Sequence, residues 1–274
     1  MIQYQNLVNQ VLLHGMQTSD RTGVGTTSIF GTRMEFDLQK GFPAVTTKKL
    51  AWKGVVAELL WFLSGSTNVY KLSEIQHGDP TKPNIWSANY EKQAKDLGYS
   101  HGELGPVYGA QFHSHNQLQN FIQGLKDNPT SRRHIISLWN PSEIDDMALP
   151  PCHGLTIQGY INDQNELSLQ WYQRSVDVFL GLPYNIASYA LFTHILAQIV
   201  GCKVGKLIFV GGDTHVYNNH MVQCETLVSR QPRSLPTLEM PSFSTLSECL
   251  ENGVTEFKLL DYNPHDAIPA PMAV

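Results

Sequence analysis

The chain has 274 residues, 42% of them hydrophobic and 16% charged, which is enough to bury a sizeable core. Its formal net charge of −5 argues against wholesale nucleic-acid binding, and no apolar stretch approaches the roughly 20 residues that span a bilayer. The first residues lack the basic and apolar regions of a secretory signal, and the four cysteines form no CxxC pair. We therefore expect a cytoplasmic protein with reduced thiols, no metal site, and no nucleic-acid or membrane partner.

The first half of the chain predicts two long helices separated by a strand. Apolar residues recur at helical spacing over residues 2–14, and side chains alternate as in a strand over residues 26–38. Residues 52–64 predict an apolar helix with one acid, Glu58, in its middle. Residues 65–116 are rich in turn signals and predict a mostly irregular, functional region.

The second half alternates strands and helices. We expect a helix at about 117–127, strands at 134–139, 155–161 and 167–172, and a helix closed by Gly201. A strand in "KLIFVGGDTHVYNNH" then leads into a helix that ends near residue 230. This order predicts one α+β domain over residues 1–274, with a mixed or mostly antiparallel sheet flanked by helices.

Cys152 stands behind two prolines in "ALPPCHGLTIQ" and is a candidate nucleophile. Neighbours in an extended strand point to opposite faces, so Cys152 and His153 cannot by themselves form a Cys–His dyad. A nearby cation could activate the thiol instead, and Arg174 in "QRSVDVFLG" is close in sequence. The alternative is that Cys152 is a small core residue.

Several other polar residues are candidates, each with a plainer alternative. Glu58 is a proton-transfer group if it is buried, and an ordinary solvated acid if it faces water. His215 and Tyr217 would share one face and suit sugar hydroxyls, although a hydrogen-bonded turn explains them nearly as well. Asn185 could read a pyrimidine edge or serve as a helix N-cap.

Arginine is sparse, with only seven in the chain, and two of these are adjacent. Their positions in polar, motif-like stretches indicate a local anion site, because the guanidinium fork suits phosphate or carboxylate. Ordinary surface salt bridging is the alternative for any one of them.

Taken together, these segments resemble the thymidylate synthase family, and phage members in particular. The resemblance covers nearly the whole chain and rests on blocks such as "SDRTGVGT", "ELLWFLSGSTN", "SRRHIISLWNP", "MALPPCH", "LQWYQRSVDVFLGLPYNIASYA" and "GGDTHVYNNH". It implies a homodimer, with the sheet as its interface, that transfers one carbon from 5,10-methylenetetrahydrofolate to C5 of dUMP.

The resemblance also implies roles for individual residues. Cys152 would attack C6 of the uracil, with Glu58, Tyr108, Arg174, Asn185 and Asp177 completing the catalytic set. The nucleotide would be held by Arg21, Gln173, Arg174, Ser175, Asp177, Asn185, His215 and Tyr217, and by Arg132 and Arg133 of the other subunit. The folate would meet Trp86, Leu149, Asp177 and Ala273, and Lys48 and Lys49 would reach its glutamates.

The chain departs from the family pattern at several supporting positions, namely Ser87, Ala110, Phe112, His113 and Gly159. Relatives that add water instead of hydride at the new carbon make 5-hydroxymethyl-dUMP, so a dUMP hydroxymethylase is the alternative activity. Asn185 favours dUMP over dCMP in either reaction, because cytosine presents the opposite edge pattern. A non-catalytic binding protein on the same scaffold is a more remote alternative.

Overall fold

A mixed six-stranded sheet forms the centre of the computed structural model, which describes residues 1–19 and 23–271. Its strand order is β1-β2-β6-β5-β4-β3, in which β5 and β6 run parallel and all other neighbours are antiparallel. These strands are β1 (Met16–Thr18), β2 (Thr26–Asp37), β3 (Ile135–Ile136), β4 (His153–Ile161), β5 (Glu166–Asp177) and β6 (Lys203–Tyr217).

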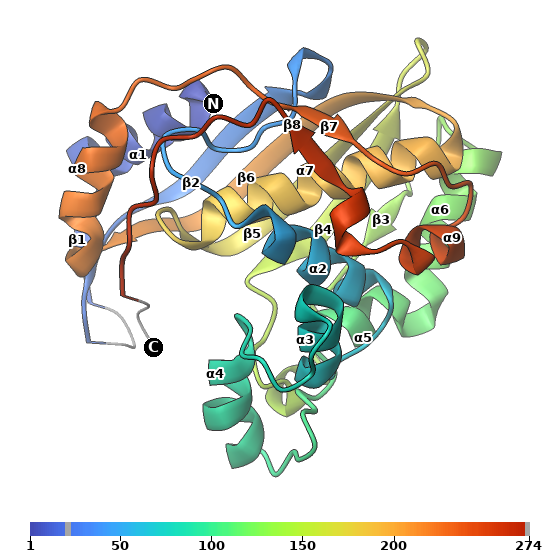
Figure 1. Ribbon diagram of the computed structural model, residues 1–274, viewed down its shortest axis with the longest axis horizontal. Coiled ribbons are helices and arrows are strands. Elements are labelled where there is room, and N and C mark those ends of the chain that lie inside the picture. The colour runs from blue at the N-terminus through green and yellow to red at the C-terminus, as the bar shows by residue number, and fades with distance from the viewer. Residues whose placement is uncertain (20–22, 272–274) are drawn as a thin grey trace.

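Helices cover one face of this sheet (Figure 1). The apolar helix α7 (Gly181–Val200) packs against β5 and β6, while α1 (Ile2–His14) packs on β2. The remaining helices are α2 (Trp52–Leu63), α3 (Val69–His77), α4 (Ser87–Asn89), α5 (Tyr108–His113), α6 (Gln117–Asp127), α8 (Met221–Ser229) and α9 (Leu246–Glu251). A separate hairpin pairs β7 (Thr237–Glu239) with β8 (Lys258–Leu260). The predicted fold class, an α+β fold with a mixed sheet flanked by helices, is confirmed.

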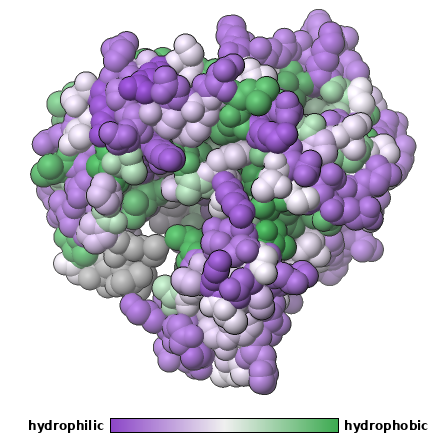
Figure 2. All heavy atoms as spheres, viewed as in Figure 1, coloured by the Kyte–Doolittle hydropathy of each residue, from purple (hydrophilic) through white to green (hydrophobic). Residues whose placement is uncertain are grey.

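The core lies between the sheet and α7, α2 and α1, where Trp61, Trp171, Phe179 and Phe209 are fully buried. Helices α3 and α4 form a lobe that projects from the main body (Figure 1). The surface of that lobe is mostly hydrophilic, whereas hydrophobic side chains show in several places on the body (Figure 2).

The prediction that residues 65–116 are mostly irregular is wrong in part. This region contains α3, α4, α5 and a π-helical turn at Tyr90–Ala94. These helices are short, so their apolar period is hard to see. Asn68 caps α3 by accepting the N–H of Tyr70, and Gly78 ends it with φ 69°. These capping residues also occur in loops, so they resemble loop punctuation in the sequence.

Candidate active site

Cys152 directly precedes β4, and its backbone is held from two sides. Its N–H donates to the hydroxyl of Tyr108 over 2.8 Å, and its carbonyl accepts the N–H of Arg174 over 2.9 Å. Sγ lies 3.8 Å from the carbonyl oxygen of Pro150, whereas the ring of His153 pairs its Nδ1 with the Tyr189 hydroxyl at 2.9 Å. The two neighbours have different partners, as the alternation of an extended chain predicts.

Arg174 supplies the cation beside the sulfur. Its Nη2 lies 3.9 Å from Sγ of Cys152, and its Nε donates to the carbonyl of Pro151 over 2.9 Å. The ring of Trp139 packs 5.4 Å from the guanidinium carbon. A fixed cation favours thiolate over thiol. This half-buried Cys152 therefore has the surroundings of a nucleophile rather than those of a core residue.

Aromatic rings surround the Tyr108 hydroxyl that Cys152 contacts. Phe62 stacks on Tyr108 with centroids 4.7 Å apart, His153 lies at 4.6 Å, and Trp86 meets it edge-on at 5.8 Å. Burial raises the pKa of Tyr108 well above its ordinary value, and the nearby Cys152 raises it further. The phenol stays protonated, and because two backbone N–H groups donate to its oxygen, its own proton remains to be donated.

Glu58 extends from α2 toward the same aromatic group. The indole Nε1 of Trp86 donates to its Oε1 over 2.7 Å. Burial raises the pKa of Glu58 to about 7, and the bond from Trp86 opposes this rise. The acid is partly exposed yet surrounded by apolar residues, so the alternative of an ordinary solvated acid does not describe it.

Asn185 lies near the start of α7, just after its first turn, and beside β5. Its Nδ2 donates to Oε1 of Gln173 over 3.1 Å, and Gln173 is itself fixed by donating to the carbonyl of Ser175 over 3.1 Å. The alternative role as an N-cap is wrong, because the helix begins at Gly181 and its N-cap residue is Leu180. The Asp177 carboxylate organises the turn before the helix by accepting the N–H groups of Phe179 and Leu180. Asn185 therefore offers a fixed donor and an acceptor to the space in front of β5.

Strand pairing joins the remaining nucleotide candidates. The antiparallel pair β4–β5 places His153 opposite Gln173, and the parallel pair β5–β6 places Asp177 opposite His215 and Ser175 opposite Asp213. His215 Nδ1 lies 3.0 Å from the Asp213 carboxylate, and its ring meets Tyr217 edge-on at 5.1 Å. Residues far apart in the sequence are thus collected at one end of the central strands.

Lys48 does not reach outward. Its Nζ donates to the carbonyl of Phe179 over 2.5 Å and lies 3.9 Å from the centre of that ring. Burial lowers the pKa of Lys48 to about 8, although Asp177 opposes this shift. The position does not fit the expected contact with folate glutamates, whereas the neighbouring Lys49 is exposed. Leu149, three residues before Cys152, is partly buried against the core.

The arginines differ in their surroundings. Arg132 and Arg133 are exposed just before β3, in the same chain but outside the cluster around Cys152. Arg33 forms a surface ion pair with Glu35 at 2.7 Å, while Arg230 and Arg233 donate to backbone carbonyls. Arg21, like Ala273, lies outside the described residues. The plain alternative of surface pairing therefore holds for Arg33, and Arg174 lies at the site.

Tyr189 lies near Cys152 but was not singled out from the sequence, which considered His153 only as a possible dyad partner of Cys152. Tyr189 stacks on Trp171 at 4.7 Å and bonds His153 at 2.9 Å, and burial lowers the pKa of His153 to about 3. The signal that could have found Tyr189 is its spacing: it lies four residues after Asn185 on one helix face.

The departures from the family pattern have mainly structural explanations. Ser87 Oγ accepts the N–H of Asn84 over 2.9 Å, and Phe112 packs edge-on against Phe192. His113 Nε2 pairs with the carbonyl of Leu63 at 2.9 Å. A side chain at Gly159 would meet Phe121 of α6 at 2.9 Å. The structure gives no account of Ala110.

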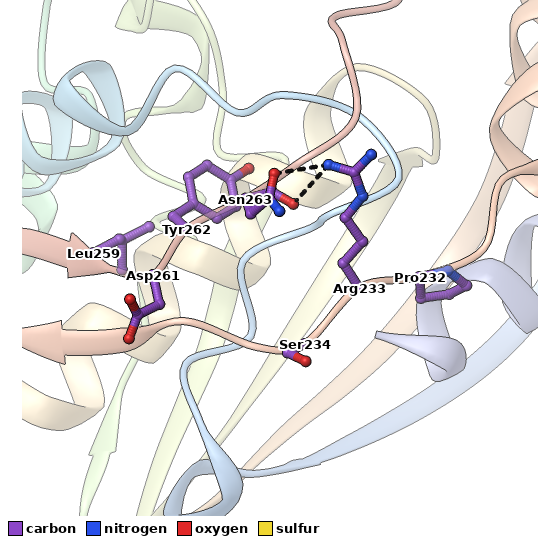
Figure 3. A pocket seen from close by; sticks show the side chains of 7 residues that line it. All are labelled: Pro232, Arg233, Ser234, Leu259, Asp261, Tyr262 and Asn263. Carbon is purple, nitrogen blue, oxygen red and sulfur yellow. Dashed lines mark hydrogen bonds between the residues drawn. The ribbon is translucent and has the colours of Figure 1, made fainter.

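Outside the cluster around Cys152, the described residues form no other site that contains predicted catalytic or binding residues. A surface hollow of about 800 Å³ is lined by Pro232, Arg233, Ser234, Leu259, Asp261, Tyr262 and Asn263, none of them a predicted site residue (Figure 3). Within the described ranges, no group of three or more His, Cys, Asp or Glu side chains is arranged to hold a metal ion. In the same ranges, no helix is both long and apolar enough to cross a membrane.

Comparison with known proteins gives full-length matches. Residues 2–274 match the family model described as thymidylate synthase. The chain is 54% identical over 279 residues to the probable thymidylate synthase of Escherichia phage T5, and 48% identical over 288 residues to the thymidylate synthase of Enterobacteria phage T4. Both alignments cover 100% of each chain. The crystal structure of the phage T4 enzyme superposes with a TM-score of 0.95 at 48% identity, again covering both chains completely.

Proposed function

The chain belongs to the thymidylate synthase family of enzymes, and from this premise we propose that it methylates C5 of dUMP to give dTMP. The observation that carries the proposal is the sulfur of Cys152 held 3.9 Å from the Arg174 guanidinium, beside a fixed Asn185 amide. The cosubstrate, 5,10-methylenetetrahydrofolate, supplies one carbon and then a hydride, and leaves as dihydrofolate. We treat residues 1–274 as one catalytic domain.

Cys152 starts the reaction in this proposal. Its thiolate forms a bond to C6 of uracil, the C5–C6 double bond opens, and the electron pair moves toward O4, so that C5 becomes a nucleophile. Arg174 keeps the sulfur ionised and, with Ser175, binds the phosphate. After the carbon is attached, a proton leaves C5 and the bond between this carbon and the folate nitrogen breaks. A hydride from the folate then adds to the exocyclic carbon as the Cys152–C6 bond breaks, which regenerates the thiolate.

Glu58 and Tyr108 donate and accept the protons at O4 and C5 of the base. Glu58 has a pKa of about 7 and can therefore both give and take a proton near neutrality. The Tyr108 hydroxyl is protonated and accepts the backbone N–H of Cys152, so in this proposal its own proton is available close to the nucleophile. Asn185 donates to O4 and accepts from N3–H, while His215 and Tyr217 bind the deoxyribose hydroxyl.

The described residues fit a reduced folate. Asp177 uses one carboxylate oxygen, Oδ1, for the turn, which leaves Oδ2 to accept from N–H groups of a pterin. Trp86 is aligned by its bond to Glu58 and offers an aromatic surface that excludes water. Leu149 would add apolar contact. Lys49, rather than the buried Lys48, would reach the glutamates.

We also infer a homodimer with a shared site. The sheet face away from α7 exposes large apolar side chains, with Phe30 at 84%, Tyr160 at 59% and Ile135 at 46%. Arg132 and Arg133 are exposed next to this face, where a second copy could offer its phosphate site. The cytoplasm is our prediction for the location.

Incubation with dUMP and methylenetetrahydrofolate tests the reaction. Formation of dihydrofolate, seen as rising absorbance, with dTMP by mass spectrometry supports the proposal. The matched control is Cys152→Ala, which should form neither. Hydroxymethyl-dUMP without dihydrofolate would contradict the proposal in favour of the hydroxymethylase, which no structural observation favours: Ser87 and Gly159 serve backbone and packing roles.

The covalent step has its own test. With 5-fluoro-dUMP the proton at C5 is replaced by fluorine, which cannot leave as a cation, so the adduct with folate should persist. Intact-protein mass spectrometry should show both molecules attached to wild-type protein and neither attached to Cys152→Ala. Active enzyme with no adduct on Cys152 would refute the proposed nucleophile.

A further inference from the structure

The C-terminal segment, residues 261–271, has no helix or strand and is held by hydrogen bonds to other parts of the chain. Arg233 donates to the Asn263 side chain over 2.8 Å (Figure 3), and Arg230 donates to the Asp266 carbonyl over 2.7 Å. The segment then runs past α8 toward the end of the chain (Figure 1). The bond between the carbonyl of Pro271 and Nε2 of His220, at 2.6 Å, comes last.

His220 is unusual among the groups that hold this segment, because its ring is entirely buried. A carbonyl oxygen only accepts, so the proton of the pair must lie on Nε2. The other ring nitrogen, Nδ1, has no partner among the residues that the structure describes. Burying an unpaired polar atom costs free energy. A phenylalanine would fill the same space without that cost, so packing alone does not explain a histidine here.

The same ring touches the proposed active site on its other side. Its centroid lies 5.5 Å from the ring of Phe179 and 5.7 Å from that of Tyr217. Phe179 belongs to the turn that the Asp177 carboxylate organises, with Oδ1 accepting its N–H over 3.0 Å. His220 thus contacts the proposed nucleotide residue Tyr217, the turn next to Asp177, and the end of the described C-terminal segment.

We propose that His220 is a positioning residue that fixes Pro271 against the folate side of the active site. It acts through the Pro271 carbonyl and touches no substrate. The consequence rests on the proposed function, because the ring of His220 packs on Phe179, in the turn formed by Asp177, which we assign to the pterin. Loss of the Nε2 donor should weaken folate use while leaving the nucleotide site formed.

The test compares His220→Phe, which keeps the aromatic contacts and removes the donor, with His220→Gln, whose amide restores a donor at similar reach. His194→Phe is the matched control, because His194 also has a buried Nε2 but this atom has no partner among the described residues. The readouts are KM for methylenetetrahydrofolate, Kd for dUMP by calorimetry, and deuterium uptake of the C-terminal peptide.

For His220→Phe we expect KM for the folate to rise by about three- to tenfold, the size of one net hydrogen bond. C-terminal deuterium uptake should accelerate, while Kd for dUMP stays within about twofold. The Gln variant should recover most of both effects, and His194→Phe should show neither. Unchanged uptake, unchanged KM, or equal losses in dUMP binding would overturn the proposal. If the wild-type protein makes no dTMP, the proposed function fails, and the uptake measurement still decides whether His220 anchors Pro271.

Discussion

Single residues around Cys152 are fixed by protein partners before any substrate binds. Arg174 is oriented by the Pro151 carbonyl, Asn185 by Gln173, and Tyr108 by the backbone N–H of Cys152 itself. Groups that are held in place in this way need little reorganisation during the reaction, which is the main source of electrostatic catalysis. Mutation of a supporting partner such as Gln173 should therefore lower turnover, because the group that it holds would lose its orientation.

Glu58→Gln should lower kcat by roughly 10²–10⁴-fold, the range for removing a positioned proton-transfer group. The amide still accepts the bond from Trp86, so the fold should be kept. Because the pKa of Glu58 is about 7, wild-type kcat should change as pH passes through 7, and the residual kcat of the variant should not. Superimposable pH profiles of kcat for the two proteins would contradict a proton-transfer role.

The same variant makes a prediction about stability. Burial raises the pKa of Glu58 from 4.5 in the unfolded chain to about 7, so the folded state binds more protons between these values. The stabilising contribution is fully present below pH 4.5 and is lost as pH rises through 7. Relative to wild type, Glu58→Gln should therefore be more stable above pH 7 than in acid, as measured by urea unfolding.

Asn185→Asp should reverse the hydrogen-bond pattern offered to the base. We expect kcat/KM for dUMP to fall by at least about 10²-fold and dCMP to become a detectable substrate, because an unmatched buried edge leaves polar groups unpaired. The amide of Gln173 can flip to donate to the new carboxylate, which limits damage to the fold. Steady-state kinetics with both nucleotides measures the change, and an unaltered base preference would exclude Asn185 as the reader of the base.

Sequence predicts single residues well where the argument is local. Strand alternation correctly separates the side-chain partners of Cys152 and His153, and the acid that stands out in the apolar helix, Glu58, has a pKa raised to about 7 by burial. The inward course of Lys48 could not be predicted this way, because its partner Phe179 lies 131 positions away. Tyr189 was missed for the same reason, since its role depends on strand β4 lying beside α7.

Among the elements, β4 carries a local irregularity that shapes the site. Its pairing with β5 shifts register between His153 and Thr156, and Gly154 in this bulge has φ 69°. A side chain at Gly154 would collide with the Tyr189 hydroxyl and come within 2.8 Å of Leu138. The glycine thus allows the strand to approach α7 closely, next to Cys152.

Gly154→Ala should therefore cost more than backbone strain alone. Its control is Gly201→Ala, which has φ 81° but open space around the new carbon. The control should lose about 1–2 kcal/mol, or roughly 2–8 °C in melting temperature, with little change in kcat. Gly154→Ala should lose more stability and also activity, because Tyr189 and His153 must move. Equal effects of the two substitutions on melting temperature and kcat would show that the close approach does not matter.

Long elements are the part of the fold that the sequence predicts best. The helix at residues 2–14 and the strand over 26–37 match within one residue, because many side chains report the same period. The strand expected at 134–139 shrinks to Ile135–Ile136, since it pairs only at the edge of the sheet. The residues at which a strand begins and ends depend on the neighbouring strand with which it pairs, and the local sequence carries no information about that neighbour.

For the whole molecule, the outer face of the sheet remains to be explained. Phe30 and Tyr160 expose large apolar surfaces there, which a soluble monomer seldom keeps. Arg132 and Arg133 lie beside this face and far along the chain from Arg174. Both facts follow if two copies pack through their sheets and each lends its arginines to the other.

A mixing experiment tests this shared site. Arg132→Ala should be nearly inactive because the phosphate loses a charge-assisted partner, and Cys152→Ala should be inactive because it lacks the nucleophile. In a mixed dimer, one of the two sites would combine an intact Cys152 with an intact Arg132 from the other subunit. After unfolding and refolding the two variants together, activity should therefore recover toward about a quarter of the wild-type value, the statistical limit for random pairing of two subunits. Refolding each variant alone is the control. Verified mixed dimers without recovered dTMP formation would mean that Arg132 serves its own subunit or none.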